Sequence, residues 1–172
     1  MKSKTTEEHK KHSAIKIKCG IITLSDSKSK NQDIGKKEDL SGQYLINELE
    51  KKYEINNYSL IPDDKKELLN SINNMKNDVD VIFTTGGTGL GSRDITVETI
   101  QSIFEKELTG FGEIFRMETY KELGTTAILS RATAGIYDKT LIFALPGSPN
   151  AVKLGLSIVI NELGHLVKHL KE

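Results

Sequence analysis

Strand-like runs and helical spacings of apolar residues alternate along this chain. The apolar runs predict four strands, at Ile15–Leu24, Glu54–Ile61, Val79–Thr84 and Thr140–Leu145. Helical spacing predicts helices over Leu40–Tyr53, from Asp64 to Met75, from Thr96 onward, over Phe111–Leu123, and from Pro149 to Leu170 as one long helix. Strands that alternate with helices favour an α/β fold, in which a mostly parallel sheet is covered on both faces.

Local capping signals support two of the predicted helices. Ser148 is a favourable N-cap residue, and Pro149 suits the first helical position after it. Asp63 and Asp64 precede another helix, where Asp64 and Glu67 have the spacing of a capping box. These signals place both helix starts directly after predicted strands.

Composition narrows the class of protein. The 172 residues contain 24 basic and 24 acidic side chains, so the formal net charge is zero and nucleic acid is a poor candidate partner. The lysine-rich stretch Lys28–Lys37 lacks interleaved aromatic residues, and we expect a solvated mobile loop there that serves as a lid. The length predicts a single domain over residues 14–172, after a flexible polar tail at residues 1–13.

Cellular location is indicated by one cysteine and by hydropathy. Cys19 lies in an apolar run and has no second cysteine to pair with, so we expect a buried thiol and a reducing compartment. No run approaches the roughly 18 apolar residues of a membrane span, and the first residues lack the apolar core of a secretory signal. A cytoplasmic protein without a membrane partner is the expectation.

A glycine-rich loop is the sharpest local signal. It occupies residues 84–94, after a predicted strand, and contains Gly86, Gly87, Gly89 and Gly91. Glycines allow backbone N–H groups to approach a ligand, which favours an anion cradle for phosphate over a plain tight turn. The spacing matches neither a P-loop nor a dinucleotide fingerprint. Arg93 and the adjacent Asp94 fit either a surface ion pair or a phosphate-binding arginine beside a metal-binding aspartate.

Aspartates stand near the ends of several predicted strands, namely Asp26, Asp39, Asp63 and Asp94. In a mostly parallel sheet, ligands bind outside the carboxyl ends of the strands. The three loops at Ser25–Asp26, Thr85–Asp94 and Pro146–Pro149 are therefore expected to converge on one crevice. Carboxylates that meet phosphates there would suit Mg²⁺, which takes one or two carboxylates plus phosphate oxygens.

Two other features have plain structural explanations. Pro146–Pro149 reads as a capped helix start, with a second phosphate site as the functional alternative. His165 and His169 lie four residues apart on the last predicted helix, but the Glu of an H-E-x-x-H zinc motif is absent, and cationic side chains near a helix C-terminus are favourable without a metal. We therefore expect no metal there.

Six blocks, in order over nearly the whole chain, carry a family resemblance. They are Leu24-Ser25-Asp26, Asp39-Leu40-Ser41-Gly42, Pro62-Asp63-Asp64, Thr84–Gly89 followed by Arg93-Asp94, Leu129-Ser130-Arg131-Ala132, and Pro146-Gly147-Ser148-Pro149. In this combination the chain resembles the molybdopterin-binding MoaB/MogA family of molybdenum cofactor biosynthesis, with the MoaB branch favoured.

The resemblance implies a three-layer α/β/α, MogA/MoaB-like molybdopterin-binding fold and a homotrimer or homohexamer. It also implies a reaction in which molybdopterin and Mg-ATP give adenylyl-molybdopterin and pyrophosphate. The product then passes to a molybdenum insertase for molybdate or tungstate loading. The alternative is a non-catalytic protein that binds or delivers molybdopterin.

The family's two essential acidic positions fall on Asp63 and Asp94, which would carry catalysis and hold Mg²⁺. Their presence favours the enzyme over the delivery protein. The residues expected to bind substrate are Ser25, Asp26, Asp39, Ser41, Gly42, Thr85, Gly86, Gly87, Thr88, Gly89, Arg93, Pro146, Gly147, Ser148 and Pro149.

Overall fold

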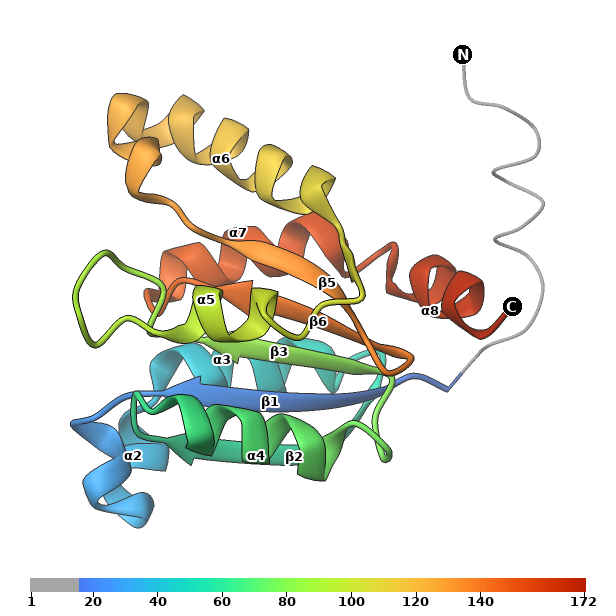
Figure 1. Cartoon of the computed structure of the whole chain (residues 1–172), viewed down its shortest axis with the longest axis horizontal. Helices are drawn as coiled ribbons and strands as arrows, with labels where there is room; N and C mark the ends of the chain where they lie inside the picture. Colours follow the sequence, from blue (N-terminus) through green and yellow to red (C-terminus); the bar gives the residue numbers. More distant parts are fainter. Residues whose placement is uncertain (1–15) are drawn as a thin grey trace.

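A six-stranded sheet forms the centre of the computed structural model, which describes residues 16–172 (Figure 1). Its strands are β1 (Lys18–Leu24), β2 (Glu54–Ile61), β3 (Val81–Thr85), β4 (Lys106–Glu107), β5 (Thr133–Tyr137) and β6 (Thr140–Leu145). The spatial order is β2-β1-β3-β6-β5-β4. The first four strands in this order are parallel, whereas β5 and β4 run antiparallel to their neighbours. The predicted mostly parallel sheet is confirmed.

Helices cover both faces of the sheet. They are α2 (Gln32–Glu38), α3 (Leu40–Leu49), α4 (Lys65–Met75), α5 (Thr96–Gln101), α6 (Thr109–Leu123), α7 (Pro149–Val159) and α8 (Leu163–Lys171), with 3₁₀ turns η2 (Lys28–Lys30) and η3 (Gly124–Leu129). Figure 1 shows α4 and α5 in front of the sheet, and α3 and α7 behind it. The three-layer α/β/α arrangement expected from the resemblance is therefore present.

The alternation of side chains along the strands divides the core into two parts. Phe83 and Phe143 lie on the side of α3, α6, α7 and α8, with ring centroids 5.3 Å apart in a stacked pair. Their neighbours Ile82 and Ile142 point to the opposite side, under α4 and α5. All four are buried. Burial on both faces explains why these strands read as continuous apolar runs in the sequence.

The predicted long C-terminal helix is wrong, because the structure divides it into α7 and α8. The break falls at residues 160–162. There the Ile160 carbonyl accepts a hydrogen bond from the Tyr53 hydroxyl at 2.7 Å, and the Glu162 N–H bonds the Val159 carbonyl. The apolar stripe continues past the break, since Leu163 and Val167 are fully buried, so periodicity alone did not reveal it.

The predicted mobile loop at Lys28–Lys37 is also corrected, because η2 and α2 occupy most of it. The Asn31 side chain caps α2 by accepting from the Ile34 N–H, and the Gln32 side chain donates to the Leu60 carbonyl at 2.9 Å. Polar side chains thus give residues 28–37 a regular structure that no apolar pattern predicts.

The next helix, α3, was predicted to reach Tyr53 and ends at Leu49.

Two further expectations concern the N-terminal tail and membrane-spanning helices. The predicted flexible tail at residues 1–13 lies outside the described residues. Within residues 16–172, no helix combines the length and the apolar character needed to cross a membrane.

Candidate active site

The loops that follow β1, β3 and β6 meet at one edge of the sheet. The Gly86 N–H donates to the Leu145 carbonyl at 3.1 Å, and the Thr85 hydroxyl donates to the Pro146 carbonyl at 3.1 Å. The loop after β1 meets the loop after β3 because Arg93 Nε donates to the Asp26 carboxylate at 3.0 Å. The predicted convergence is confirmed, and Figure 1 shows the loop after β3 extending beyond the strand ends.

The glycine-rich loop requires glycine at its first turn. Gly86 has φ +100° and Gly87 has φ +62°, conformations that other residues rarely adopt. A Cβ atom on Gly86 would also lie 2.3 Å from the Leu24 carbonyl oxygen. The start of α5 holds this turn, because the Thr96 hydroxyl donates to the Gly86 carbonyl at 2.8 Å and the Thr96 N–H donates to Gly87. The loop backbone is thereby fixed and unobstructed.

A cavity of about 420 Å³ opens beside this loop. Eight predicted site residues line it: Gly86, Gly87, Thr88, Gly89, Asp94, Pro146, Gly147 and Ser148. The remaining lining residues were not predicted: Phe115, Thr119, Glu122, Leu123, Thr126, Leu129, Ser130, Asn150, Ala151 and Leu154. They come from α6, η3 and the start of α7. α6 and α7 were expected, whereas η3 was not, and periodicity did not show which helix face would turn toward the glycine-rich loop. Leu129 and Ser130 stand in one of the six blocks that carry the family resemblance, which was the sequence signal for them.

The cavity combines two kinds of surface. Backbone of the glycine-rich loop and the carboxylate of Asp94 form one part, and apolar side chains such as Phe115, Leu129 and Leu154 form another. A ligand with a flat ring system and a phosphate group matches this combination, since apolar walls bury rings and a few polar groups fix orientation.

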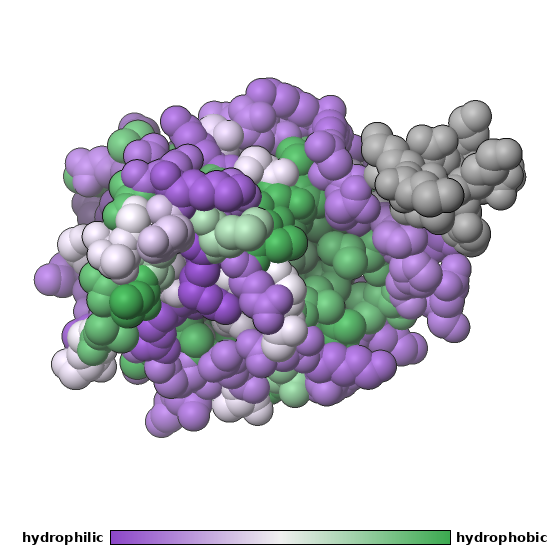
Figure 2. Space-filling model, turned by 90° about the horizontal axis from the view of Figure 1, so that it is seen from above, coloured by the Kyte–Doolittle hydropathy of each residue, from purple (hydrophilic) through white to green (hydrophobic). Residues whose placement is uncertain are grey.

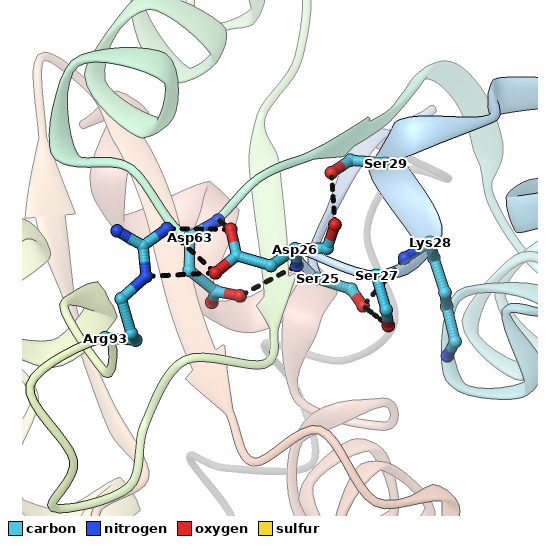
Figure 3. A network of polar contacts seen from close by, with 7 residues as sticks. All are labelled: Ser25, Asp26, Ser27, Lys28, Ser29, Asp63 and Arg93. Atoms are coloured by element: carbon cyan, nitrogen blue, oxygen red, sulfur yellow. Dashed lines mark hydrogen bonds and ion pairs between the residues drawn. The ribbon is translucent and has the colours of Figure 1, made fainter.

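Asp26, Asp63 and Arg93 form one polar network next to the loop (Figure 3). The Asp26 N–H donates to the Asp63 carboxylate, and the Asp63 N–H donates to the Asp26 carboxylate, both at 3.0 Å. Arg93 donates to both Asp26 oxygens, from Nε at 3.0 Å and from Nη2 at 2.8 Å. Arg93 therefore pairs with Asp26, and the surface pair with the adjacent Asp94 considered from the sequence does not form.

The network gives its two aspartates different acidities. Hydrogen bonds from Arg93 lower the pKa of Asp26, and the backbone bond from Asp63 adds to that effect. Partial burial raises the pKa of Asp63 above its ordinary value, and the negative charges of Asp26 and Asp94 act in the same direction. Asp63 thus lies where negative charge is already in excess, which is a suitable place for a cation.

The carboxylates of Asp63 and of Asp94, the last residue of the glycine-rich loop, both lie against the loop's backbone. An Oδ1 atom of Asp63 lies 2.8 Å from where a Cβ of Gly87 would stand, and Asp94 Oδ2 lies 2.6 Å from the equivalent point on Gly89. Within residues 16–172 no three His, Cys, Asp or Glu side chains converge to hold a metal. Two carboxylates beside a glycine-rich loop are a suitable set for Mg²⁺, which would take its other ligands from phosphate oxygens and water.

Four predicted residues are buried and support the site from behind. Asp39 caps α3 by accepting from the Gly42 N–H at 3.1 Å, and it accepts from the Tyr58 hydroxyl at 2.6 Å. The Ser41 hydroxyl donates to the Gly147 carbonyl at 2.8 Å. The bonds from Ser41 and from Thr85, which donates to the Pro146 carbonyl, fix the loop after β6 that lines the cavity. Asp39 instead fixes the start of α3, the helix that carries Ser41.

The remaining candidates have local roles. Ser148 caps α7 by accepting from the Ala151 N–H, and Pro149 is the first residue of that helix. The Ser25 hydroxyl accepts from the Lys28 N–H. Asp64, rather than Asp63, caps α4, which leaves the Asp63 carboxylate to Asp26. Cys19 is buried, and burial raises the pKa of its thiol to about 12. This fits a structural cysteine rather than a reactive one.

The fold is a three-layer α/β protein with a glycine-rich loop and two nearby carboxylates, Asp63 and Asp94, at the carboxyl edge of its sheet. Residues 20–165 match the family model described as "Probable molybdopterin binding domain", and the chain belongs to that family. It is 47% identical to the "Molybdopterin adenylyltransferase" of Pyrococcus furiosus, covering 96% of this chain and 98% of the relative. It is 39% identical to "Molybdenum cofactor biosynthesis protein B" of Bacillus subtilis, covering 98% of each.

A solved structure extends the likeness to three dimensions. The crystal structure of the tungsten cofactor synthesizing protein MoaB from Pyrococcus furiosus is similar with a TM-score of 0.85 and 45% identity. The match covers 93% of this chain and all of that one. The family resemblance read from the six sequence blocks is confirmed.

Proposed function

We propose that this chain is a molybdopterin adenylyltransferase, which joins the AMP part of ATP to molybdopterin and releases pyrophosphate. One observation carries the proposal: a cavity suited to a ring and a phosphate is walled by a glycine-rich loop that Asp63 and Asp94 flank. The names of relatives at 45 to 47% identity over nearly the whole chain support the same activity.

The reaction needs no nucleophile from the protein. An oxygen of the terminal phosphate of molybdopterin attacks the α-phosphorus of ATP and forms a new P–O bond. The bond from the α-phosphorus to the pyrophosphate oxygen breaks, and its electron pair leaves with pyrophosphate. Such transfers depend chiefly on alignment of the two phosphates and on compensation of their charge.

The chain's own residues supply that alignment. Backbone N–H groups of Gly87, Thr88 and Gly89 would cradle phosphate oxygens, and Asp63 with Asp94 would hold the Mg²⁺ that accompanies ATP. Mg²⁺ held by these two carboxylates would offset the negative charge of the phosphates. The Nη1 group of Arg93 makes no hydrogen bond within residues 16–172, so it can contact a phosphate while Nε and Nη2 keep Asp26.

The test is a reaction of the purified protein with molybdopterin, ATP and Mg²⁺, followed by pyrophosphate release and by the mass of the pterin product. A variant with Asp63→Ala and Asp94→Ala is run beside it. The proposal expects adenylyl-molybdopterin from the wild type and none from the variant. Pterin binding without any adenylyl product from the wild type would reject the enzyme and leave the binding or delivery protein.

A homotrimer or homohexamer belongs to the same proposal. Six apolar side chains on α6 and η3 are 44 to 81% exposed: Ile114, Met117, Tyr120, Leu123, Ile128 and Leu129. Figure 2 looks onto the side that carries α6 and shows hydrophobic residues gathered around a hollow. Exposed apolar surface of this extent is typical of a subunit interface. Sedimentation should give a multiple of the chain mass, and Ile128→Lys should lower it; a monomeric wild type would reject the assembly.

Delivery of the product to a molybdenum insertase and a cytoplasmic location complete the proposal. The buried free thiol of Cys19 supports a reducing compartment. Co-purification of the insertase with this chain, dependent on bound adenylyl-molybdopterin, would test the partner.

A further inference from the structure

The part of the glycine-rich loop next to Asp94 is tethered to the rest of the molecule at few points. Within residues 16–172, the stretch 88–93 makes two side-chain contacts with distant parts of the chain. One is the Arg93–Asp26 pair, and the other joins the Gly89 carbonyl to Arg131. Leu90, at the middle of the stretch, is 70% exposed, so packing does little to hold it. These two contacts tie the stretch to distant parts of the chain, in addition to the local bonds between Gly91 and Asp94.

Arg131 reaches the loop from the start of β5. Its Nη1 donates to the Gly89 carbonyl oxygen at 3.0 Å, across 42 residues of sequence. Its Nη2 pairs with Glu98 on α5, the helix that directly follows the loop. The Arg131 side chain is 24% exposed, whereas that of Arg93 is 67% exposed. Arg131 thus bridges the middle of the loop to the helix at the loop's end, through a partly buried side chain.

Gly89 connects this bridge to the acidic pair. Asp94 Oδ2 lies 2.6 Å from the point where a Gly89 Cβ would stand, so the Gly89 backbone lies directly against the carboxylate. The same oxygen accepts from the Gly91 N–H at 2.9 Å. A shift of Gly89 would therefore move the backbone against which the Asp94 carboxylate packs.

We propose that Arg131 is a positioning residue for the adenylyl transfer: by holding the Gly89 carbonyl and Glu98 together, it fixes the loop that orients Asp94. This inference rests on the proposed function. Arg131 is not among the residues that line the cavity beside the glycine-rich loop. Its loss is expected to lower kcat more than it changes KM, because substrate contacts remain while the alignment of the reacting phosphates is loosened.

The chain offers a matched control. Arg116 and Arg131 both line a second cavity, which shares Ser130 with the cavity beside the glycine-rich loop. Arg116 has no hydrogen-bond or ion-pair partner within residues 16–172. Arg116→Gln removes an equal charge without touching the loop. Glu98→Gln removes the negative charge that pairs with Arg131, at a site that is 61% exposed, where loss of the fold is not expected.

Loop order has a readout independent of catalysis, because the chain contains no tryptophan. Leu90→Trp places a single fluorophore on the loop. In this background, Arg131→Gln and Glu98→Gln should lower the tryptophan anisotropy and raise its quenching by acrylamide, whereas Arg116→Gln should change neither. Unchanged loop fluorescence in both Arg131→Gln and Glu98→Gln would overturn the proposal.

The kinetic arm uses the same substitutions in the otherwise wild-type chain. Arg131→Gln should lower kcat about tenfold to a hundredfold with the KM values for ATP and molybdopterin nearly unchanged, since small misplacements of reacting groups cost rates of this order. Arg131→Lys, which can still donate to Gly89, should recover part of kcat. A wild-type kcat in Arg131→Gln would overturn the inference. If the wild-type protein forms no adenylyl product, the proposed function fails. The fluorescence experiment then still tests whether Arg131 keeps the loop ordered.

Discussion

Asp26 and Asp63 exchange hydrogen bonds, each backbone N–H donating to the carboxylate of the other at 3.0 Å. The exchange joins the loop after β1 to the loop after β2 and holds the Asp63 carboxylate beside the glycine-rich loop (Figure 3). Arg93 balances the charge of Asp26, but Asp63 has no such partner, and its pKa is raised. The protein thus keeps a carboxylate in an unfavourable setting at the place where the proposed reaction requires one.

Asp63→Asn should therefore abolish adenylyl transfer and raise thermal stability. A carboxyl group whose pKa is raised on folding opposes folding at any pH above its unfolded value, because ionisation favours the unfolded chain. The asparagine oxygen can still accept from the Asp26 N–H. Calorimetry and the product assay on the same preparation measure both effects. Asp64→Asn, on the adjacent helix cap, is the matched control and should change neither; a less stable Asp63→Asn protein would contradict this account.

The raised pKa of Asp63 also sets a pH dependence. Cation binding requires the ionised form, so kcat/KM should fall on the acid side, at a higher pH than an ordinary carboxyl of pKa 3.8 would give. The positive charge of Arg93 lowers the pKa of Asp63, so Arg93→Gln should move the acid limb to higher pH. Profiles of kcat/KM against pH for the two proteins test this. An acid limb that stays in place or moves down would be inconsistent with control by Asp63.

Asp39 should matter for stability more than for chemistry. Its buried carboxylate caps α3 and accepts from Tyr58, so Asp39→Ala leaves both the Gly42 N–H and the Tyr58 hydroxyl without an acceptor. We expect a loss of about 3 kcal/mol in the free energy of unfolding, from the cap and a buried charged hydrogen bond. Tyr58→Phe, which removes one donor alone, should cost about 1 kcal/mol. Denaturant unfolding measures both, and equal losses would show that the cap contributes nothing.

Gly86 and Gly110 provide a paired test of the loop geometry. Gly86→Ala places a Cβ at φ +100° and 2.3 Å from the Leu24 carbonyl, so backbone strain alone should cost about 1–3 kcal/mol and pterin binding should be lost. Gly110 lies in the first turn of α6 with nothing within 4 Å of an added Cβ. Gly110→Ala should stabilise by about 0.5–1 kcal/mol. Thermal unfolding and pterin titration of both variants measure these effects. A Gly86→Ala protein with wild-type stability and pterin binding would refute the strained turn.

Sequence alone predicted the parts of this molecule whose signals are local. The bounds of β2 and β6, the start of α7 and the convergence of three loops follow from apolar runs, capping residues and the geometry of parallel sheets. It did not predict β5, a short strand that contains Ala134 and Gly135 and lacks a continuous apolar run. The break between α7 and α8 was hidden because the apolar stripe runs through it.

The polar contacts of the site were harder to predict than its members. Asp26, Asp63 and Arg93 were each candidates, but adjacency in sequence suggested Arg93 with Asp94, whereas the fold joins Arg93 to Asp26 across 67 residues. The hydrogen bond from Arg131 to the Gly89 carbonyl spans 42 residues. Because its acceptor is a backbone carbonyl, no pattern of residue types in the sequence predicts it. Such contacts depend on the order of strands in the sheet and on which helix face turns inward.

The most direct test of the central claim measures binding and turnover together in Asp94→Asn. Molybdopterin affinity, followed by fluorescence titration, should stay close to that of the wild type, because the ring contacts and the loop backbone are retained. Formation of adenylyl-molybdopterin should fall at least about a hundredfold, as when a charged group that supports a transition state is removed. Product formation at the wild-type rate in this variant would contradict the assignment of the acidic pair.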